Sequence, residues 1–229
     1  MKKTTALALT FVIFTISMYA AVEEKNIKKT ITYDSVYPVE KSTIKPQEAL
    51  ERLKQGNIRY QRGGKISMEF DRNRGGAQSP FAAVLSCADS RVTPESVFYV
   101  QSGQLFVTRV AGNIVNQELV GSLEFAVRVF GTALIVVLGH ESCGAVDAAL
   151  AGTPQPGAIQ SILNAITPGI AGVNRKSPNA RSEGVIANVR AQVRQLRAND
   201  TLKEFVGRGQ LMIVGGVYNF RDGSVAWLE

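Results

Sequence analysis

Residues 133–144 read ALIVVLGHESCG, an apolar run followed at once by a histidine, a glutamate and a cysteine. An uninterrupted apolar run of this length is typical of a strand that is covered on both faces of a sheet. The polar residues then fall at the carboxyl end of the strand, where open parallel sheets place their functional sites. The stretch therefore predicts a buried strand that delivers His140 and Cys143 to a site.

Other apolar runs have the same character, at residues 81–86, 105–110 and 211–214. Between the second and third strands along the chain, residues 118–130 carry apolar side chains at helical spacing. A strand, a helix and a strand with short connections imply right-handed parallel crossovers. The sequence therefore predicts an α/β fold, with a mainly parallel central sheet of about four strands flanked by helices.

Both ends of this domain carry additional elements. Pro46 opens an amphipathic helix, which makes an extended N-terminal helical arm, and Gly56 and Asn57 are expected to end its first part. Near the C-terminus, Asp222 and Gly223 form a turn signal within residues 217–228. That signal predicts a closing C-terminal strand or hairpin.

Composition indicates one ordinary globular domain. The chain has 229 residues, of which 45% are hydrophobic and 20% charged, with a formal net charge of +7. A positive surplus can indicate a nucleic-acid partner, but no run of four or more Lys or Arg occurs and no basic stripe is interleaved with aromatic residues. We therefore expect a basic soluble protein that does not bind nucleic acid.

The first twenty residues differ from the rest. Lys2 and Lys3 precede an uncharged apolar run over residues 6–16, and small residues follow it. This layout is typical of a secretory signal peptide, and the run is short of the roughly 20 residues that a membrane-spanning helix needs. We expect a signal peptide at 1–20, a mobile arm at 21–45 and a single folded domain at 46–229. The protein is then periplasmic or secreted, with no stable membrane partner.

The whole chain contains one histidine and two cysteines, which are His140, Cys87 and Cys143. In an oxidising compartment, two cysteines first suggest a disulfide. However, Cys143 lies three residues after His140, and Cys87 also ends an apolar run. Two thiolates and one imidazole are a known catalytic zinc set that leaves a fourth position open for water. A closed structural zinc site would need a carboxylate as its fourth ligand.

Two motifs resemble those of the β-class carbonic anhydrases. Residues 87–91 read CADSR and match the family's C-x-D-S-R, and residues 140–144 read HESCG and match its H-x-x-C-G. The resemblance runs from about Pro46 to the C-terminus. It implies a zinc ion held by Cys87, His140 and Cys143, and reversible hydration of carbon dioxide to bicarbonate and a proton by attack of a zinc-bound hydroxide. It also implies a homodimer or a multiple of dimers.

The resemblance implies further roles. Asp89 is expected to orient the hydroxide, and Arg91 to hold Asp89 away from the metal; an ordinary ion pair is the alternative. Substrate binding is implied for Gln78, Phe106, Phe125 and the backbone of Gly144. Arg109 and Gly112 fall in a stretch similar to the family's R-x-A-[GN]-N.

Three alternative functions stay open at this point. A few members of the same family hydrolyse carbon disulfide or carbonyl sulfide, and their motifs do not separate the substrates. A disulfide between Cys87 and Cys143 would instead indicate an exported protein without enzymatic activity. A Cys143 nucleophile with His140 as its base is the third, although it leaves Asp89 and Arg91 unexplained.

Overall fold

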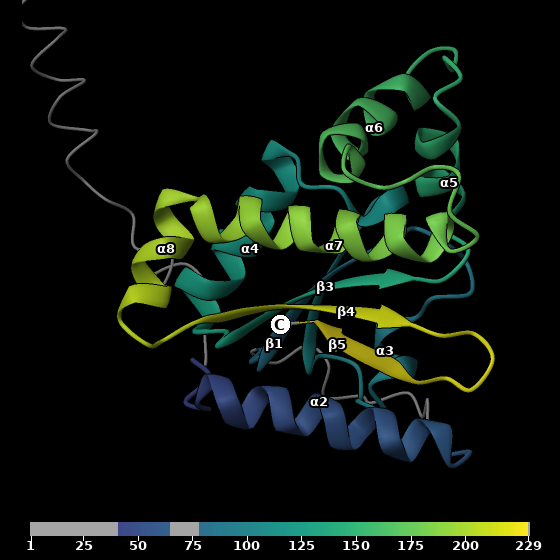
Figure 1. The fold of residues 1–229 in the computed structure, drawn as a ribbon. Coiled ribbons are helices and arrows are strands. Elements are labelled where there is room, and N and C mark those ends of the chain that lie inside the picture. The colour runs from purple at the N-terminus through teal and green to yellow at the C-terminus, as the bar shows by residue number, and fades with distance from the viewer. Residues whose placement is uncertain (1–40, 65–77, 229) are drawn as a thin grey trace, which may run out of the picture. The chain divides into compact units, whose positions relative to one another are not determined.

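A computed structural model of the chain describes residues 41–64 and 78–228, and within them the central sheet has the strand order β2-β1-β3-β4-β5. The first four strands along the chain are parallel, and the last is antiparallel to its neighbour (Figure 1). The strands are β1 (Ala82–Ser86), β2 (Leu105–Arg109), β3 (Leu134–His140), β4 (Met212–Tyr218) and β5 (Val225–Leu228). The predicted parallel sheet and C-terminal hairpin are confirmed.

Helices cover both faces of this sheet (Figure 1). The helix α2 packs on one face, and α4, α7 and α8 pack on the other. Alternate residues along each strand point to opposite faces, so Val84 and Val136 face α2 whereas Leu85 and Val137 face α4 and α7. The helices are α2 (Pro46–Gln61), α3 (Pro94–Val97), α4 (Gln117–Phe130), α5 (Gly144–Ala151), α6 (Ile159–Ile166), α7 (Ala180–Ala198) and α8 (Asp200–Gly207), with 3-10 turns η2 (Ala111–Asn113) and η3 (Thr167–Ile170).

Local signals explain where the helices begin and end. Pro46 is the first residue of α2, where its missing N–H costs nothing. The Asn116 side chain caps α4 by accepting a hydrogen bond from the Leu119 N–H, and Gly131 ends that helix with φ 66°. The predicted helix over residues 118–130 is therefore confirmed.

The prediction that Gly56 and Asn57 end the first part of the N-terminal helix is wrong, because α2 continues to Gln61. Gly56 packs directly against the backbone of Phe98, the residue after α3. An added Cβ at Gly56 would stand 1.8 Å from the Phe98 carbonyl oxygen. The Asn57 amide donates to the carbonyls of Val97 and Gly223, at 2.9 and 2.8 Å. Both residues dock the helix by tertiary contacts, which outweigh their weak helix propensity.

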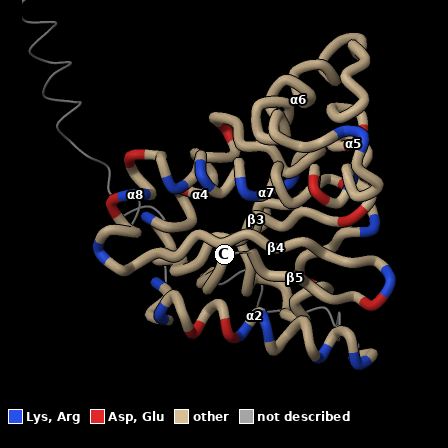
Figure 2. The backbone as a smooth tube through the Cα atoms, viewed as in Figure 1, with Lys and Arg blue, Asp and Glu red and all other residues tan. Residues whose placement is uncertain are grey.

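Within the described residues, the acidic and basic positions lie mostly on helices and loops of the backbone trace (Figure 2). Basic and acidic residues are interspersed along α2, as in the pair Arg52–Glu48. On α7, Arg190 and Arg194 are exposed, and Arg197 donates to the Ile213 carbonyl. No helix in residues 41–64 and 78–228 is long and apolar enough to span a membrane. The predicted signal peptide at 1–20 and most of the predicted arm lie outside the described residues.

Replacing Asn57 by alanine should lower the free energy of unfolding by about 2–4 kcal/mol, because it leaves buried backbone groups without partners. The Asn57 side chain also accepts a hydrogen bond from the Val225 N–H, so the substitution removes a contact of the β4–β5 hairpin as well. Urea unfolding measures the change. Gln55→Ala, on the exposed side of the same helix, is the control, and equal losses in both variants would contradict the docking role.

Candidate metal centre

Three metal-ligating side chains meet at the carboxyl end of the sheet. Cys87 directly follows β1, His140 is the last residue of β3, and Cys143 precedes α5. The β1–β3 register pairs Ser86 with Leu138, which brings the two strand ends side by side. The two Sγ atoms and a ring nitrogen of His140 all lie within 4.8 Å of one another, and all three residues are buried. The predicted ligand trio is therefore brought together by the fold.

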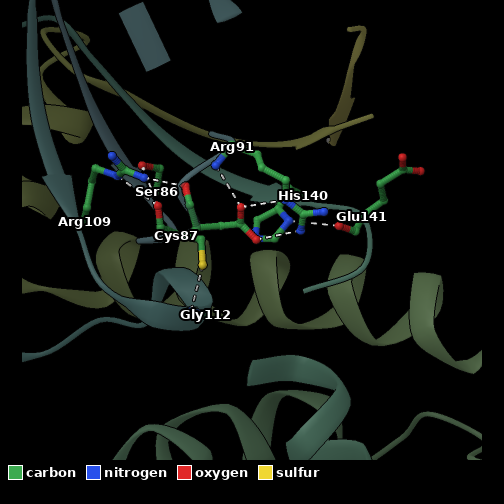
Figure 3. Close-up of polar contacts among 8 residues, drawn as sticks. Ser86, Cys87, Arg91, Arg109, Gly112, His140 and Glu141 are labelled. Carbon is green, nitrogen blue, oxygen red and sulfur yellow. Dashed lines mark hydrogen bonds and ion pairs between the residues drawn. The ribbon is translucent and has the colours of Figure 1, made fainter. Parts of the chain in front are cut away.

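The His140 ring is oriented for coordination. Its Nδ1 lies 2.9 Å from the Glu141 carbonyl oxygen, which accepts a hydrogen bond from the Nδ1–H tautomer (Figure 3). Its Nε2 is buried and has no hydrogen-bond partner among the described residues. A metal-binding histidine usually donates one ring N–H to a carbonyl or carboxylate and presents the other nitrogen to the metal. The buried nitrogen and the two adjacent thiols fit a zinc ion.

Cys143 is placed by a tight turn. Ser142 has φ 55°, an uncommon conformation for a residue with a side chain, and it reverses the chain between β3 and α5. Gly144 follows as the exposed first residue of α5. The amino end of a helix favours negative charge, so both the Cys143 thiolate and an anion near Gly144 are stabilised there.

The η2 turn contacts the Cys87 sulfur. The Gly112 N–H donates to this Sγ at 3.3 Å, and Gly112 has φ 70° (Figure 3). Contact with the Cys143 thiol lowers the pKa of Cys87 to about 4, against the opposing effect of burial. The same contact raises the pKa of Cys143. Both cysteines bind a divalent ion only as thiolates, so zinc binding at this pair is coupled to loss of a proton.

The predicted pair of Asp89 and Arg91 lies beside the trio. Arg91 Nε donates to Asp89 Oδ1 at 2.9 Å and its terminal nitrogen donates to Oδ2 at 2.8 Å, a two-pronged ion pair. This guanidinium holds the pKa of Asp89 well below its usual range. Asp89 Oδ2 also lies 3.9 Å from His140 Nε2. The carboxylate is therefore ionised, held by Arg91, and adjacent to the position of a metal.

Arg109 fixes the loop that carries both groups. Its side chain donates to the carbonyls of Cys87 and Asp89, at 3.0 and 2.7 Å (Figure 3). These two hydrogen bonds fix the backbone between Cys87 and Asp89. This geometry gives Arg109 a structural role.

The predicted substrate residues are placed differently from the ligands. Gln78 is exposed and lies at the start of the described segment that leads into β1. Phe106 pairs in register with Ala83, four residues before Cys87, so it lies roughly 13 Å along the strands from the metal ligands. Phe106 and Phe125 pack with Phe130 in a cluster of rings. Within one chain, these two rings do not line the centre.

Sequence reasoning missed two residues at this centre. Glu141 accepts a hydrogen bond from the Phe220 N–H at 2.9 Å, and the Phe220 ring lies 5.4 Å from the His140 ring, centroid to centroid. Glu141 belongs to the H-x-x-C-G motif, but Phe220 lies far along the chain. Only the parallel pairing of β3 with β4, which sets His140 beside Tyr218, brings it here.

Comparisons with known proteins agree with this geometry. A family model described as carbonic anhydrase matches residues 82–225. Carbonic anhydrase 2 of Mycobacterium tuberculosis is 37% identical over 187 residues, which cover 78% of this chain and 90% of that protein. A solved Coccomyxa β-carbonic anhydrase in complex with acetazolamide has a TM-score of 0.63 at 27% identity, covering 80% of this chain and 82% of that one. The chain belongs to the β-class carbonic anhydrases.

A further relative of this β-carbonic anhydrase is the carbonic anhydrase of Mycolicibacterium smegmatis, which is 37% identical over 190 residues, covering 79% of this chain and 92% of that protein. Zinc is the cofactor of this class, and Cys87, His140 and Cys143 form the cluster that can hold it. Both cysteines are free thiols, so the disulfide-stapled alternative gains no support. The alternative of a carbon disulfide or carbonyl sulfide hydrolase gains none either.

Replacing Cys143 by serine should abolish retention of zinc, because the thiolate is lost from a three-residue ligand set. Zinc per chain after dialysis against a weak chelator measures this. Asp89→Ala is the control and should keep its zinc, since the carboxylate is held by Arg91. Serine variants that retain zinc as tightly as the parent would show that the cluster is not the metal site.

Zinc affinity should also fall as the pH falls. Burial acts to lower the pKa of His140, but the negative charge of the neighbouring Cys87 thiolate opposes it and the pKa is raised, while contact with Cys87 raises the pKa of Cys143. Both groups bind a metal only after losing a proton, so acid competes with zinc. Competition against a fluorescent chelator across a pH series measures the trend, and a pH-independent affinity would contradict it.

Proposed function

We propose that this carbonic anhydrase hydrates carbon dioxide with Asp89 and Arg91 as its catalytic pair beside a zinc ion held by Cys87, His140 and Cys143. Bound zinc supplies a Lewis acid that lowers the pKa of water and makes hydroxide available near neutral pH. The observation that carries the proposal is the placement of an ionised, Arg91-held Asp89 carboxylate 3.9 Å from the unpartnered His140 Nε2.

Asp89 positions the nucleophile. An ionised carboxylate only accepts hydrogen bonds, so Asp89 would accept one from the hydroxide that zinc makes available and would orient its lone pair toward the carbon of carbon dioxide. Arg91 occupies both carboxylate oxygens and keeps Asp89 from becoming a fourth ligand. This pair therefore decides whether the centre is open to substrate. An Asp89 carboxylate bound to the metal would close it.

Two polar groups are assigned to the substrate oxygens, and because Gln78 precedes the amino end of β1 whereas Cys87 follows its carboxyl end, the Gln78 of a second copy would be the one to reach the centre. Gln78 offers an amide donor, and the Gly144 N–H lies at the amino end of α5. Both suit the oxygen atoms of carbon dioxide, which become more negative as bicarbonate forms. We assign Gln78 and Gly144 to substrate binding on this chemistry.

The apolar side of the substrate site is assigned to a second copy of the chain. Phe106 lies on β2, the edge strand of the described sheet, and its register keeps it away from its own Cys87. A partner packed along this edge can present its Phe106 and Phe125 to the centre as an apolar slot for carbon dioxide. Sedimentation of the full chain tests the dimer, and a fully active monomer would refute it.

Export is the proposed fate of the chain. The support is the charged start, the apolar run and the small residues within 1–20. We propose that cleavage at Ala20 or Ala21 yields a periplasmic or secreted enzyme. Sequencing the amino terminus of the protein recovered from a bacterial periplasm tests this, and an intact Met1 in the cytoplasm would contradict it.

Stopped-flow hydration assays on the zinc-loaded protein should show a rate that rises from about pH 6.5 to about pH 9. Cys87 and Cys143 together contribute two negative charges, which weakens the acidification of water at the metal and shifts the optimum upward. Asp89→Asn should lower kcat/KM by about 10²-fold or more while zinc stays bound. A flat rate at the level of the buffer control in the parent protein would overturn the proposed function.

Turnover in the same assay should depend on buffer concentration. The one histidine of the chain is a metal ligand, so no imidazole is left to carry the proton away. Raising the concentration of an imidazole-type buffer at constant ionic strength should increase kcat and leave kcat/KM unchanged. A kcat independent of buffer would show that another group of the chain exports the proton.

A further inference from the structure

Phe220 is a residue of the metal centre that no motif of the chain indicates. It lies in the turn that connects β4 to β5, beyond the carboxyl edge of the sheet (Figure 1). The Arg91 guanidinium carbon lies 4.2 Å from the centroid of its ring. The His140 and Tyr218 rings meet it edge to face, at 5.4 and 5.3 Å. One aromatic ring thus contacts both a metal ligand and the cation that holds Asp89.

The backbone of Phe220 is fixed by the same residue that orients the ligand. The Phe220 N–H donates to Glu141 Oε1 at 2.9 Å, and the Glu141 N–H donates to the Tyr218 carbonyl at 3.0 Å. The Glu141 carbonyl in turn pairs with His140 Nδ1. The ring is therefore held in register with the ligand set and does not sit on a loosely attached turn.

Arg91 needs such a support. Its side chain is 56% exposed, whereas that of Asp89 is 17% exposed, so water competes strongly for the guanidinium. A long side chain on a surface loses conformational entropy when it is held in one geometry. A guanidinium stacked over an aromatic face is held by the ring's quadrupole and gives up less hydration than an ammonium. The Phe220 ring contacts one face of the guanidinium, while Asp89 accepts hydrogen bonds from its nitrogens.

Arg91 and a metal ion at the centre would compete for the Asp89 carboxylate. It is held by Arg91, and its Oδ2 is 3.9 Å from the ring nitrogen that faces the metal position. Whatever stabilises Arg91 in its present place also favours the arrangement in which the carboxylate stays off the metal.

We propose that Phe220 is a positioning residue that keeps the centre open, by holding Arg91 in the geometry that retains Asp89. The inference rests on the proposed function of the Asp89–Arg91 pair and adds the group that stabilises it. Phe220 touches no reacting atom; it acts through Arg91 on Asp89. The ring has to be aromatic, because an aliphatic side chain of similar volume fills the space without attracting the cation.

Binding of azide to the cobalt-substituted full chain tests this, since azide and the Asp89 carboxylate compete for the same coordination position. The visible absorption of cobalt reports the titration without any need for turnover. In Phe220→Leu, the azide dissociation constant should rise about two- to five-fold, the effect expected from losing one exposed cation–π contact. Phe220→Tyr keeps an aromatic ring, so its azide dissociation constant should equal that of the parent protein. Phe205→Leu, on α8 at the other face of the sheet, is the control for losing a phenyl ring.

A double-mutant cycle identifies the route of the effect. In an Asp89→Ala background no carboxylate can compete, so adding Phe220→Leu should leave azide affinity unchanged. A loss of affinity that persists in this background, or a Phe220→Leu variant that binds azide like the parent, would overturn the proposal. Thermal unfolding of each variant separates loss of fold from loss of positioning. An inactive parent protein with the expected azide pattern would refute the proposed function alone, whereas an active parent without that pattern would refute the role of Phe220.

Discussion

The parallel pairing of β1 with β3 is the constraint on which the metal centre depends. Ser86 pairs with Leu138, so the residues that follow the two strands emerge at one edge, and Cys87 meets His140 there. A shift of one residue would turn every side chain of a strand to the opposite face. The register is held because both faces of these strands are buried in separate apolar clusters. Ligand geometry is therefore a consequence of core packing.

The helix α7 brings a second set of constraints to the same edge. Val189 packs so closely on the sheet that an added Cβ at Gly139 or at Gly215 would stand 2.5 or 2.7 Å from its methyl groups. This close approach buries Asn188 and Gln192 of α7 against the loop after β2. Asn188 donates to the Gly112 carbonyl at 2.8 Å, and Gln192 accepts from the Val115 N–H at 2.8 Å.

These buried amides connect the core to the metal ligand. The loop that they hold carries the Gly112 N–H, which donates to the Cys87 sulfur. A buried polar group without a partner is costly, so the satisfied Asn188–Gln192 pair also restricts which conformations the loop can adopt. The position of one thiolate is thus set in part by residues of α7 that lie outside the ligand set.

The sequence was most informative where the chemistry and the local pattern coincide. Apolar runs marked the strands, and the cysteines and histidine lie directly at their ends, so Cys87, His140 and Cys143 were predictable. Asp89 and Arg91 were predictable because they lie within two and four residues of a ligand. Tertiary contacts could not be predicted from the local sequence. Asn57 continues a helix because its side chain bonds to Val97 and Gly223. Phe220 reaches Arg91 only because β3 and β4 pair in this register.

The contacts of this centre differ in strength in a way that suits its chemistry. The three metal-ligating residues are buried, and strands, a turn and a helix terminus hold them, so they have little freedom. Asp89 is held by a partly exposed guanidinium that is itself held by one aromatic ring. Exposed ion pairs and single cation–π contacts are each weak, because water screens and competes for the charges. The Cys87, His140 and Cys143 side chains are therefore held rigidly, whereas the position of Asp89 is sensitive to the single side chains around it.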